Sequence, residues 1–173
     1  MNVINANVTI ASPVNAMTVD VEDYFQVSAF EPYIPRDRWD QLPQRVERNT
    51  HLILDLFANQ GIKATFFTLG WVAERHPTLI QRIVAESHEL ASHGYAHIRV
   101  TQQTPAQFRE DVIRTKALLE DLGGVTVQGY RAASYSIGAS NLWALAELEQ
   151  VGYRYSSSTV SYTHLTLPTN REV

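Results

Sequence analysis

The sequence predicts an α/β fold in which helices cover a parallel sheet. Strand-like and helix-like segments alternate along most of the chain, which is the pattern of parallel sheets with helical crossovers. The strand-like segments are continuous apolar runs, as expected for strands that are buried on both faces. With 173 residues, 45% hydrophobic and 18% charged, the chain also has the composition of one soluble globular domain.

The first half of the chain contains two predicted strands and their helices. The first strand, residues 16–19, ends in carboxylates within "MTVDVEDYF", and the proline-rich "EPYIPRDRWDQLP" is predicted to be an irregular loop. A helix is predicted from about Arg45 to Asn59, with an apolar side that includes Leu54, Leu56 and Phe57. The β-branched and aromatic "KATFFTLG" predicts a second strand, followed by one or two helices within 71–86, interrupted at Pro77.

The second half repeats this order. "HELAS" is followed by a helix that Thr104 can cap, and Gly123 and Gly124 end that helix. "VTVQGYRAASYSI" predicts a strand and a polar loop, "SNLWALAELEQVG" a helix, and "YRYSSS" the start of one more strand. Polar groups at 20–23, 93–97 and 131–135 each follow a strand, where parallel α/β folds place their chemistry. We therefore expect these three groups to lie close together.

Charge and composition exclude several functional classes. The net charge is −4 without a basic stripe, so nucleic acid is not an expected partner. No cysteine is present, so a metal would have to use His, Asp or Glu ligands. No run reaches the roughly 18 apolar residues of a membrane-spanning helix, and residues 1–16 lack the pattern of a signal peptide. We expect a cytoplasmic protein without a transmembrane segment.

The polar groups offer the ligands of a zinc-type site. His93 and His97 stand four residues apart, although such a pair can equally be surface or core histidines. The nearby carboxylates Asp20, Glu22 and Asp23 can also be a solvated acidic turn. Hydrolysis would need one carboxylate on the metal and a second as general base, and Arg131 could hold the base in position.

Five segments in this order resemble successive motifs of the polysaccharide deacetylases, carbohydrate esterase family 4, also known as the nodulation-protein-B homology domain. They are "TVDVEDYF", "TFFTLG", "ASHGYAH", "GYRAASYSI" and "GYRYSSS", and they extend from Ala16 to about Ser158. The first motif, Asp-Val-Glu-Asp, is similar to that of a branch associated with exopolysaccharide export loci. The resemblance implies a distorted, incomplete (β/α) barrel and metal-dependent removal of N-acetyl groups from a polysaccharide or oligosaccharide.

The resemblance also implies a role for each site residue. Asp20 matches the general base and Arg131 the arginine that orients it. His93, His97 and Asp23 match the metal ligands, with Glu22 as the alternative to Asp23, and the expected metal is Zn²⁺. The backbone amide near Ser134 or Tyr135 matches the donor to the oxyanion.

The end of the chain departs from the family pattern. No residue matches the histidine that serves as general acid, and the barrel motifs stop after roughly five strands. The stretch 160–169, "VSYTHLTLPT", resembles one reading frame of a sequencing-library adapter translated as protein, so His164 is not expected to be that acid. We predict an N-terminal extension (1–15), a partial deacetylase domain (16–159) and a non-native tail (160–173).

Two other functions are compatible with these motifs. A related barrel hydrolase acting on small ring amides would share the fold and part of the motifs. A noncatalytic metal-binding or carbohydrate-binding module would account for the missing general acid. Acetate release from chitooligosaccharides separates both alternatives from a deacetylase.

Overall fold

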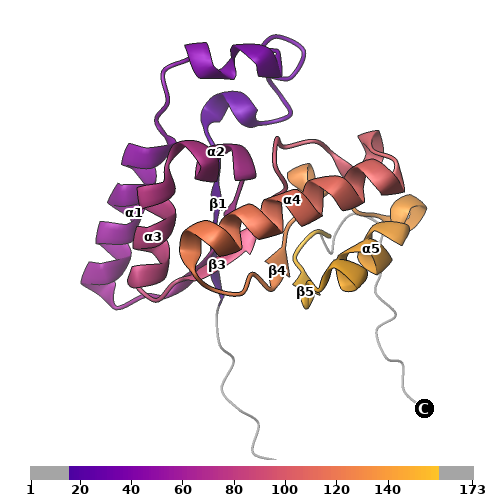
Figure 1. Cartoon of the computed structure of the whole chain (residues 1–173). Helices are drawn as coiled ribbons and strands as arrows, with labels where there is room; N and C mark the ends of the chain where they lie inside the picture. The colour runs from indigo at the N-terminus through magenta and orange to yellow at the C-terminus, as the bar shows by residue number, and fades with distance from the viewer. Residues whose placement is uncertain (1–15, 160–173) are drawn as a thin grey trace, which may run out of the picture.

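The centre of the molecule is a parallel sheet of five strands (Figure 1). The computed structural model describes residues 16–159. The predictions for the N-terminal extension, the signal peptide and the tail with His164 concern residues outside this range. The strands, in order across the sheet, are β1 (Met17–Val21), β2 (Ala64–Thr68), β3 (Glu89–Ser92), β4 (Gly129–Tyr130) and β5 (Tyr155–Ser156). The predicted α/β class is confirmed, and the unreversed strand order is that of a barrel rather than of a doubly wound sheet.

The helices that follow the strands form one connected layer. Helix α1 packs against α3, α3 against α4, and α4 against α5, while the short α2 lies between α3 and α4. Their bounds are α1 (Val46–Gln60), α2 (Gly70–Arg75), α3 (Pro77–Ala85), α4 (Pro105–Gly123) and α5 (Trp143–Val151). A layer of helices outside a sheet is the arrangement of a (β/α) barrel wall.

Local signals in the sequence set most helix ends. Helix α1 ends at Gly61, whose φ of 65° suits glycine, and α3 begins at Pro77. Thr104 and Gln107 form a capping box at the start of α4. The predicted apolar side of α1 was wrong at Leu56, which is 57% exposed, because Val46, Thr50, Leu54 and Phe57 form the buried side.

The sheet is strongly curved. Strands β1 and β4 are three strand spacings apart, which is about 14 Å in a flat sheet. The side chain of Arg131, directly after β4, nevertheless reaches β1, where it donates to Asp20 at 2.6 Å and to the Thr18 hydroxyl at 3.1 Å. The sheet must therefore curl so that β4 approaches β1 across its concave face. An open, curled sheet of five strands is consistent with the predicted incomplete barrel.

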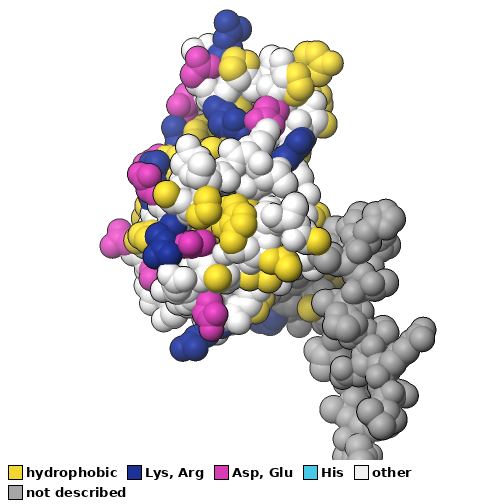
Figure 2. All heavy atoms as spheres, turned by 90° about the vertical axis from the view of Figure 1, so that its right-hand side faces the viewer, with side chains coloured by type: hydrophobic (Ala, Val, Ile, Leu, Met, Phe, Trp, Pro, Cys, Tyr) yellow, Lys and Arg dark blue, Asp and Glu magenta, His cyan; other side chains and the backbone are white. Residues whose placement is uncertain are grey.

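The segment between β1 and α1 projects above the sheet (Figures 1 and 2). It was predicted to be irregular, yet it contains two short 3-10 helices, η1 (Tyr24–Gln26) and η2 (Arg36–Gln41). Phe25 and Trp39 anchor it by packing against Trp71 of α2, with ring centroids 5.6 to 6.0 Å apart. Its base therefore lies beside the carboxyl ends of β1 and β2. None of the helices within residues 16–159 is long and apolar enough to cross a membrane.

Candidate metal centre

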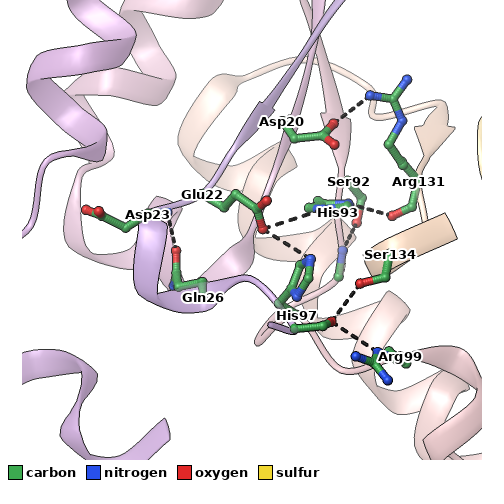
Figure 3. Close-up of polar contacts among 12 residues, drawn as sticks. Asp20, Glu22, Asp23, Gln26, Ser92, His93, His97, Arg99, Arg131 and Ser134 are labelled. Carbon is green, nitrogen blue, oxygen red and sulfur yellow. Dashed lines mark hydrogen bonds and ion pairs between the residues drawn. The ribbon is translucent and has the colours of Figure 1, made fainter. Parts of the chain in front are cut away.

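Glu22, His93 and His97 converge at the carboxyl ends of β1 and β3 (Figure 3). One ligand atom from each residue lies within 4.8 Å of the other two. The Glu22 Oε2 atom is 3.1 Å from His97 Nε2 and 3.9 Å from His93 Nε2. Within residues 16–159 this is the one group of three or more such side chains close enough to share a metal ion.

The electrostatics of this group fit a bound cation. His93 and His97 are 2% and 5% exposed, and the buried Glu22 Oε2 makes no hydrogen bond to any described residue. Burial, and then the neighbouring Asp20 charge, raise the pKa of Glu22 to about 7. Burial, and then His93, lower the pKa of His97 to about 3, and burial lowers the pKa of His93. A divalent cation would compensate the buried carboxylate and would bind the imidazoles in their neutral form.

The Nδ1 atoms of the two histidines have different environments. His93 Nδ1 donates to the Arg131 carbonyl at 2.8 Å, which leaves Nε2 free to bind a metal. His97 Nδ1 has no partner among the described residues, and the same is true of Gln26 Nε2 and Trp39 Nε1. These three buried residues border a cavity of about 30 Å³, which has room for about one water molecule.

The loop that carries both histidines has an unusual backbone. Gly94 has a φ of 75° and His97 a φ of 49°, which is uncommon for a residue with a side chain. Such conformations persist only where surrounding contacts hold them. The first two amides of α2, Gly70 and Trp71, donate to the carbonyls of Gly94 and Tyr95 at 2.9 and 3.0 Å. Arg36 donates to the Ala96 carbonyl at 2.9 Å.

Asp23, the first choice for the ligand carboxylate, does not join this group. It caps η1 through the Tyr24 amide, and its Oδ2 accepts the Arg45 and Val46 amides at 2.5 and 2.9 Å at the start of α1. Figure 3 shows its side chain pointing away from the histidines. Alternation along an extended chain places Glu22, and not Asp23, on the side of Asp20. The structure therefore brings Glu22, which was the alternative, together with the two histidines and leaves Asp23 outside this group.

Asp20 and Arg131 form the ion pair that the sequence led us to expect. Arg131 Nη1 donates to Asp20 Oδ1 at 2.6 Å, and Asp20 is not a member of the group that can share a metal. Arg131 is also held by the Ser157 hydroxyl at 2.9 Å and lies over the ring of Phe67 at 4.0 Å. The site thus contains a second carboxylate, Asp20, beside the group of Glu22 and the two histidines, and the buried guanidinium of Arg131 fixes its position.

The loop after β4 contains the two candidate oxyanion donors. Ser134 and Tyr135 both have positive φ values, 53° and 51°. The Tyr135 amide donates to the Ala132 carbonyl at 3.0 Å, which leaves the Ser134 amide as the better candidate. The Ser134 hydroxyl lies 2.6 Å from that of Ser28, which accepts from Arg99 at 3.1 Å. Ser28 and Arg99 were not predicted from the sequence, because neither belongs to a strand end or a motif.

The sequence pattern that defines polysaccharide deacetylases matches residues 38–156. The chain belongs to the polysaccharide deacetylase family. The match includes His93, His97 and Arg131 but begins after Asp20 and Glu22. The structure shows that these two carboxylates lie beside His93, His97 and Arg131.

Named members of this family are similar to the chain over part of their length. A peptidoglycan-N-acetylglucosamine deacetylase from Bacillus cereus is 30% identical over 113 residues, which are 65% of this chain and 41% of that protein. A chitooligosaccharide deacetylase from Bradyrhizobium sp. is 28% identical over 53% of this chain and 42% of its own length. The chain therefore spans about two fifths of these two relatives.

The fold agrees with this family. The solved structure of a provisionally named polysaccharide deacetylase from Mycobacterium smegmatis superposes with a TM-score of 0.66 at 28% identity. The superposition covers 83% of this chain and 50% of the other.

Proposed function

We propose that this chain provides the metal-binding half of a deacetylase that removes N-acetyl groups from a polysaccharide or oligosaccharide. The proposal rests on the position of a possible metal site directly beside an ion pair, both at the carboxyl ends of the strands. The group Glu22, His93 and His97 lies beside a carboxylate, Asp20, that is held by Arg131 and takes no part in the group. Metal-assisted hydrolysis of an amide needs both a metal site and a separate base.

The proposed metal is Zn²⁺, held by Glu22, His93 and His97. Two imidazoles and one carboxylate are a ligand set of catalytic zinc sites, which keep a position open for water or substrate. When bound, such a cation polarises an acyl carbonyl and makes a coordinated water more acidic.

We assign the proton transfer and the stabilisation of the oxyanion to residues of the chain. We assign Asp20 to accept the proton of the attacking water and Arg131 to keep Asp20 ionised and oriented. We assign the Ser134 amide to donate to the acetyl carbonyl oxygen as negative charge develops there. Among residues 16–159 no further histidine lies at the site to protonate the leaving amine, since His51, His76 and His88 bond elsewhere, to Arg82, Gln44 and Ala64.

The substrate proposal rests on the relatives and on the first motif. The relatives are named for peptidoglycan N-acetylglucosamine and chitooligosaccharides, so we propose an N-acetylated sugar polymer. Asp20-Val21-Glu22-Asp23 resembles the motif of the branch associated with exopolysaccharide export, and we propose an exopolysaccharide as the native polymer. The Asp-x-Glu spacing of this motif places both carboxylates on one side of the chain.

Acetate release tests the proposal. The full chain, loaded with Zn²⁺, is incubated with N-acetylchitooligosaccharides and separately with a five-membered cyclic imide. Acetate from the sugars alone supports the deacetylase, and ring opening alone supports a ring-amide hydrolase. Asp20→Asn should abolish acetate release while zinc content stays normal, and loss of zinc in this variant would reassign Asp20 as a ligand.

A noncatalytic binding module is the second candidate. It is favoured because, among residues 16–159, no third histidine lies at the site. A chain that binds zinc and chitooligosaccharides but releases no acetate would support this function.

A further inference from the structure

Asp111 of α4 contacts the backbone of the loop that carries the two histidines. Its two carboxylate oxygens lie 3.2 and 3.3 Å from the Tyr95 amide nitrogen, which donates to both. A Cβ atom on Gly94 would lie 3.0 Å from Asp111 Oδ2, so the carboxylate also approaches the backbone one residue earlier. Tyr95 stands midway between the two histidines of the site.

The other hydrogen bonds of the histidine loop have other partners, and Asp111 is the acceptor for the Tyr95 amide. The carbonyls of residues 94–96 accept from α2 and from Arg36. The Gly94 amide donates to the Ser92 hydroxyl of its own strand. For the Tyr95 amide, Asp111 is the acceptor, and it comes from a helix distant in sequence. The left-handed residues Gly94 and His97 flank this hydrogen bond, where the backbone needs outside support most.

The Tyr95 side chain also has partners on two helices. The Tyr95 hydroxyl donates to Glu74 at 2.7 Å, and the Arg114 guanidinium, one turn after Asp111, lies 3.6 Å from the ring centroid. Helix α4 therefore contacts Tyr95 through both the backbone and the ring.

We propose that Asp111 is a positioning residue that fixes the backbone of the histidine loop, so that His93 and His97 present their Nε2 atoms to a metal together. The inference rests on the proposed function in taking the two histidines as ligands. Asp111 contacts neither ring and acts through Tyr95 and the backbone of Gly94. Residues that support metal ligands in this way typically change metal affinity about 10-fold to 100-fold when they are removed.

The test compares the zinc affinities of three variants of the full chain, measured by competition with a chromogenic chelator. Asp111→Ala removes the acceptor and should weaken zinc binding about 10-fold to 100-fold. Asp111→Asn keeps one acceptor oxygen and should stay within about threefold of the unmodified chain. Glu110→Ala makes the same change of charge at the exposed neighbouring position and should leave the affinity unchanged.

The spectrum of the Co²⁺-loaded chain adds a readout that loss of fold stability alone would not move. Asp111→Ala should change the intensity of its visible bands, and Glu110→Ala should not. Equal zinc affinities and spectra for Asp111→Ala and the unmodified chain would overturn the inference.

Amide hydrogen exchange keeps the inference testable if Asp111→Ala does not fold. In the unmodified, metal-free chain the Tyr95 amide should exchange about 10-fold or more slowly than in an unstructured peptide. Exchange at the unstructured rate would overturn the positioning role. Zinc binding that survives His93→Ala and His97→Ala would instead contradict the proposed function, and Tyr95 exchange would still report on Asp111.

Discussion

Glu22 and Asp23 are adjacent carboxylates with different environments. Glu22 lies on the same side of the extended chain as Asp20 and faces the two histidines, whereas Asp23 faces the backbone at the starts of η1 and α1. Both carboxylate oxygens of Asp23 accept from backbone amides, which satisfies donors that a helix start leaves unpaired. We therefore expect that mutation can separate the stability of the fold, at Asp23, from the proposed metal binding, at Glu22.

At the residue scale, Glu22→Gln and Asp23→Ala should have opposite effects. Glu22→Gln removes a buried carboxylate, so zinc affinity should fall at least about 10-fold while the metal-free protein is no less stable at pH 8. Asp23→Ala leaves buried amides without an acceptor and should cost about 2 kcal/mol of unfolding free energy, with zinc affinity nearly unchanged. Urea unfolding and chelator competition measure the two quantities. Zinc binding lost only in Asp23→Ala would return the ligand role to Asp23.

The residues predicted from sequence were those that follow strands. Asp20, His93, His97 and Arg131 lie together because parallel strands bring their carboxyl ends to one edge. The capping position of Asp23 was visible in the sequence, since Asp23 and Gln26 have the spacing of a capping box. Ser28 and Arg99 reach the site through loops whose path no local pattern records.

At the element scale, helix α4 contains a buried carboxylate, Asp111, whose ionised form destabilises the fold. Burial raises the pKa of Asp111 to about 6, although the Tyr95 amide and the Arg114 charge act in the opposite direction. The phenols of Tyr130 and Tyr153 are the other titratable groups near this carboxylate. An ionised group retained in such a place is expected where position matters more than stability.

Asp111→Asn should therefore stabilise the fold in a pH-dependent way. In the unfolded chain an aspartate has a pKa of about 3.9, below the folded value, so the folded state binds the proton more tightly. The contribution of Asp111 to stability is greatest below about pH 4 and is lost as the pH rises through about 6. Relative to the unmodified chain, the free energy of unfolding of Asp111→Asn should be larger by on the order of 1–2 kcal/mol at pH 8 and unchanged at pH 4.

Urea unfolding at pH 4, 6 and 8 measures this gain, with Glu110→Gln as the control on the same helix. The exposed Glu110 should change stability by less than about 0.5 kcal/mol at each pH. A gain in Asp111→Asn that is equal at pH 4 and pH 8 would contradict burial of the carboxylate as its cause.

Helices were predictable as elements, and the segment between β1 and α1 was not. The starts and ends of α1, α3 and α4 coincide with Gly61, Pro77 and Thr104, whose local chemistry is visible in the sequence. The projecting segment is shaped by aromatic packing of Phe25 and Trp39 on Trp71, which is distant in sequence. Such tertiary contacts leave no periodic pattern.

At the scale of the whole molecule, Arg131 connects parts of the sheet that strand pairing keeps apart. It bonds to Asp20 and Thr18 on the edge strand β1 and to Ser157, directly after the edge strand β5. One buried guanidinium thus spans the concave face, and we expect the curvature that brings Asp20 beside the histidines to depend on it. Breaking a buried pair by removing one partner typically costs several kcal/mol, since the other charge loses its compensation.

Arg131→Met should open the sheet as well as destabilise it. We expect the free energy of unfolding to fall by about 2–4 kcal/mol. This is a small loss for a buried ion pair, because the Asp20 side chain is 27% exposed.

The sequence has no cysteine, so Met17→Cys on β1 and Arg154→Cys before β5 would give two unique positions for spin labels. Their distance distribution, measured by pulsed electron paramagnetic resonance, should be narrow with Arg131 and should broaden toward longer distances in Arg131→Met. Asp20→Asn, which keeps an acceptor for Arg131, should broaden it less. An unchanged distribution in a folded Arg131→Met protein would show that strand pairing and the helix layer set the curl without Arg131.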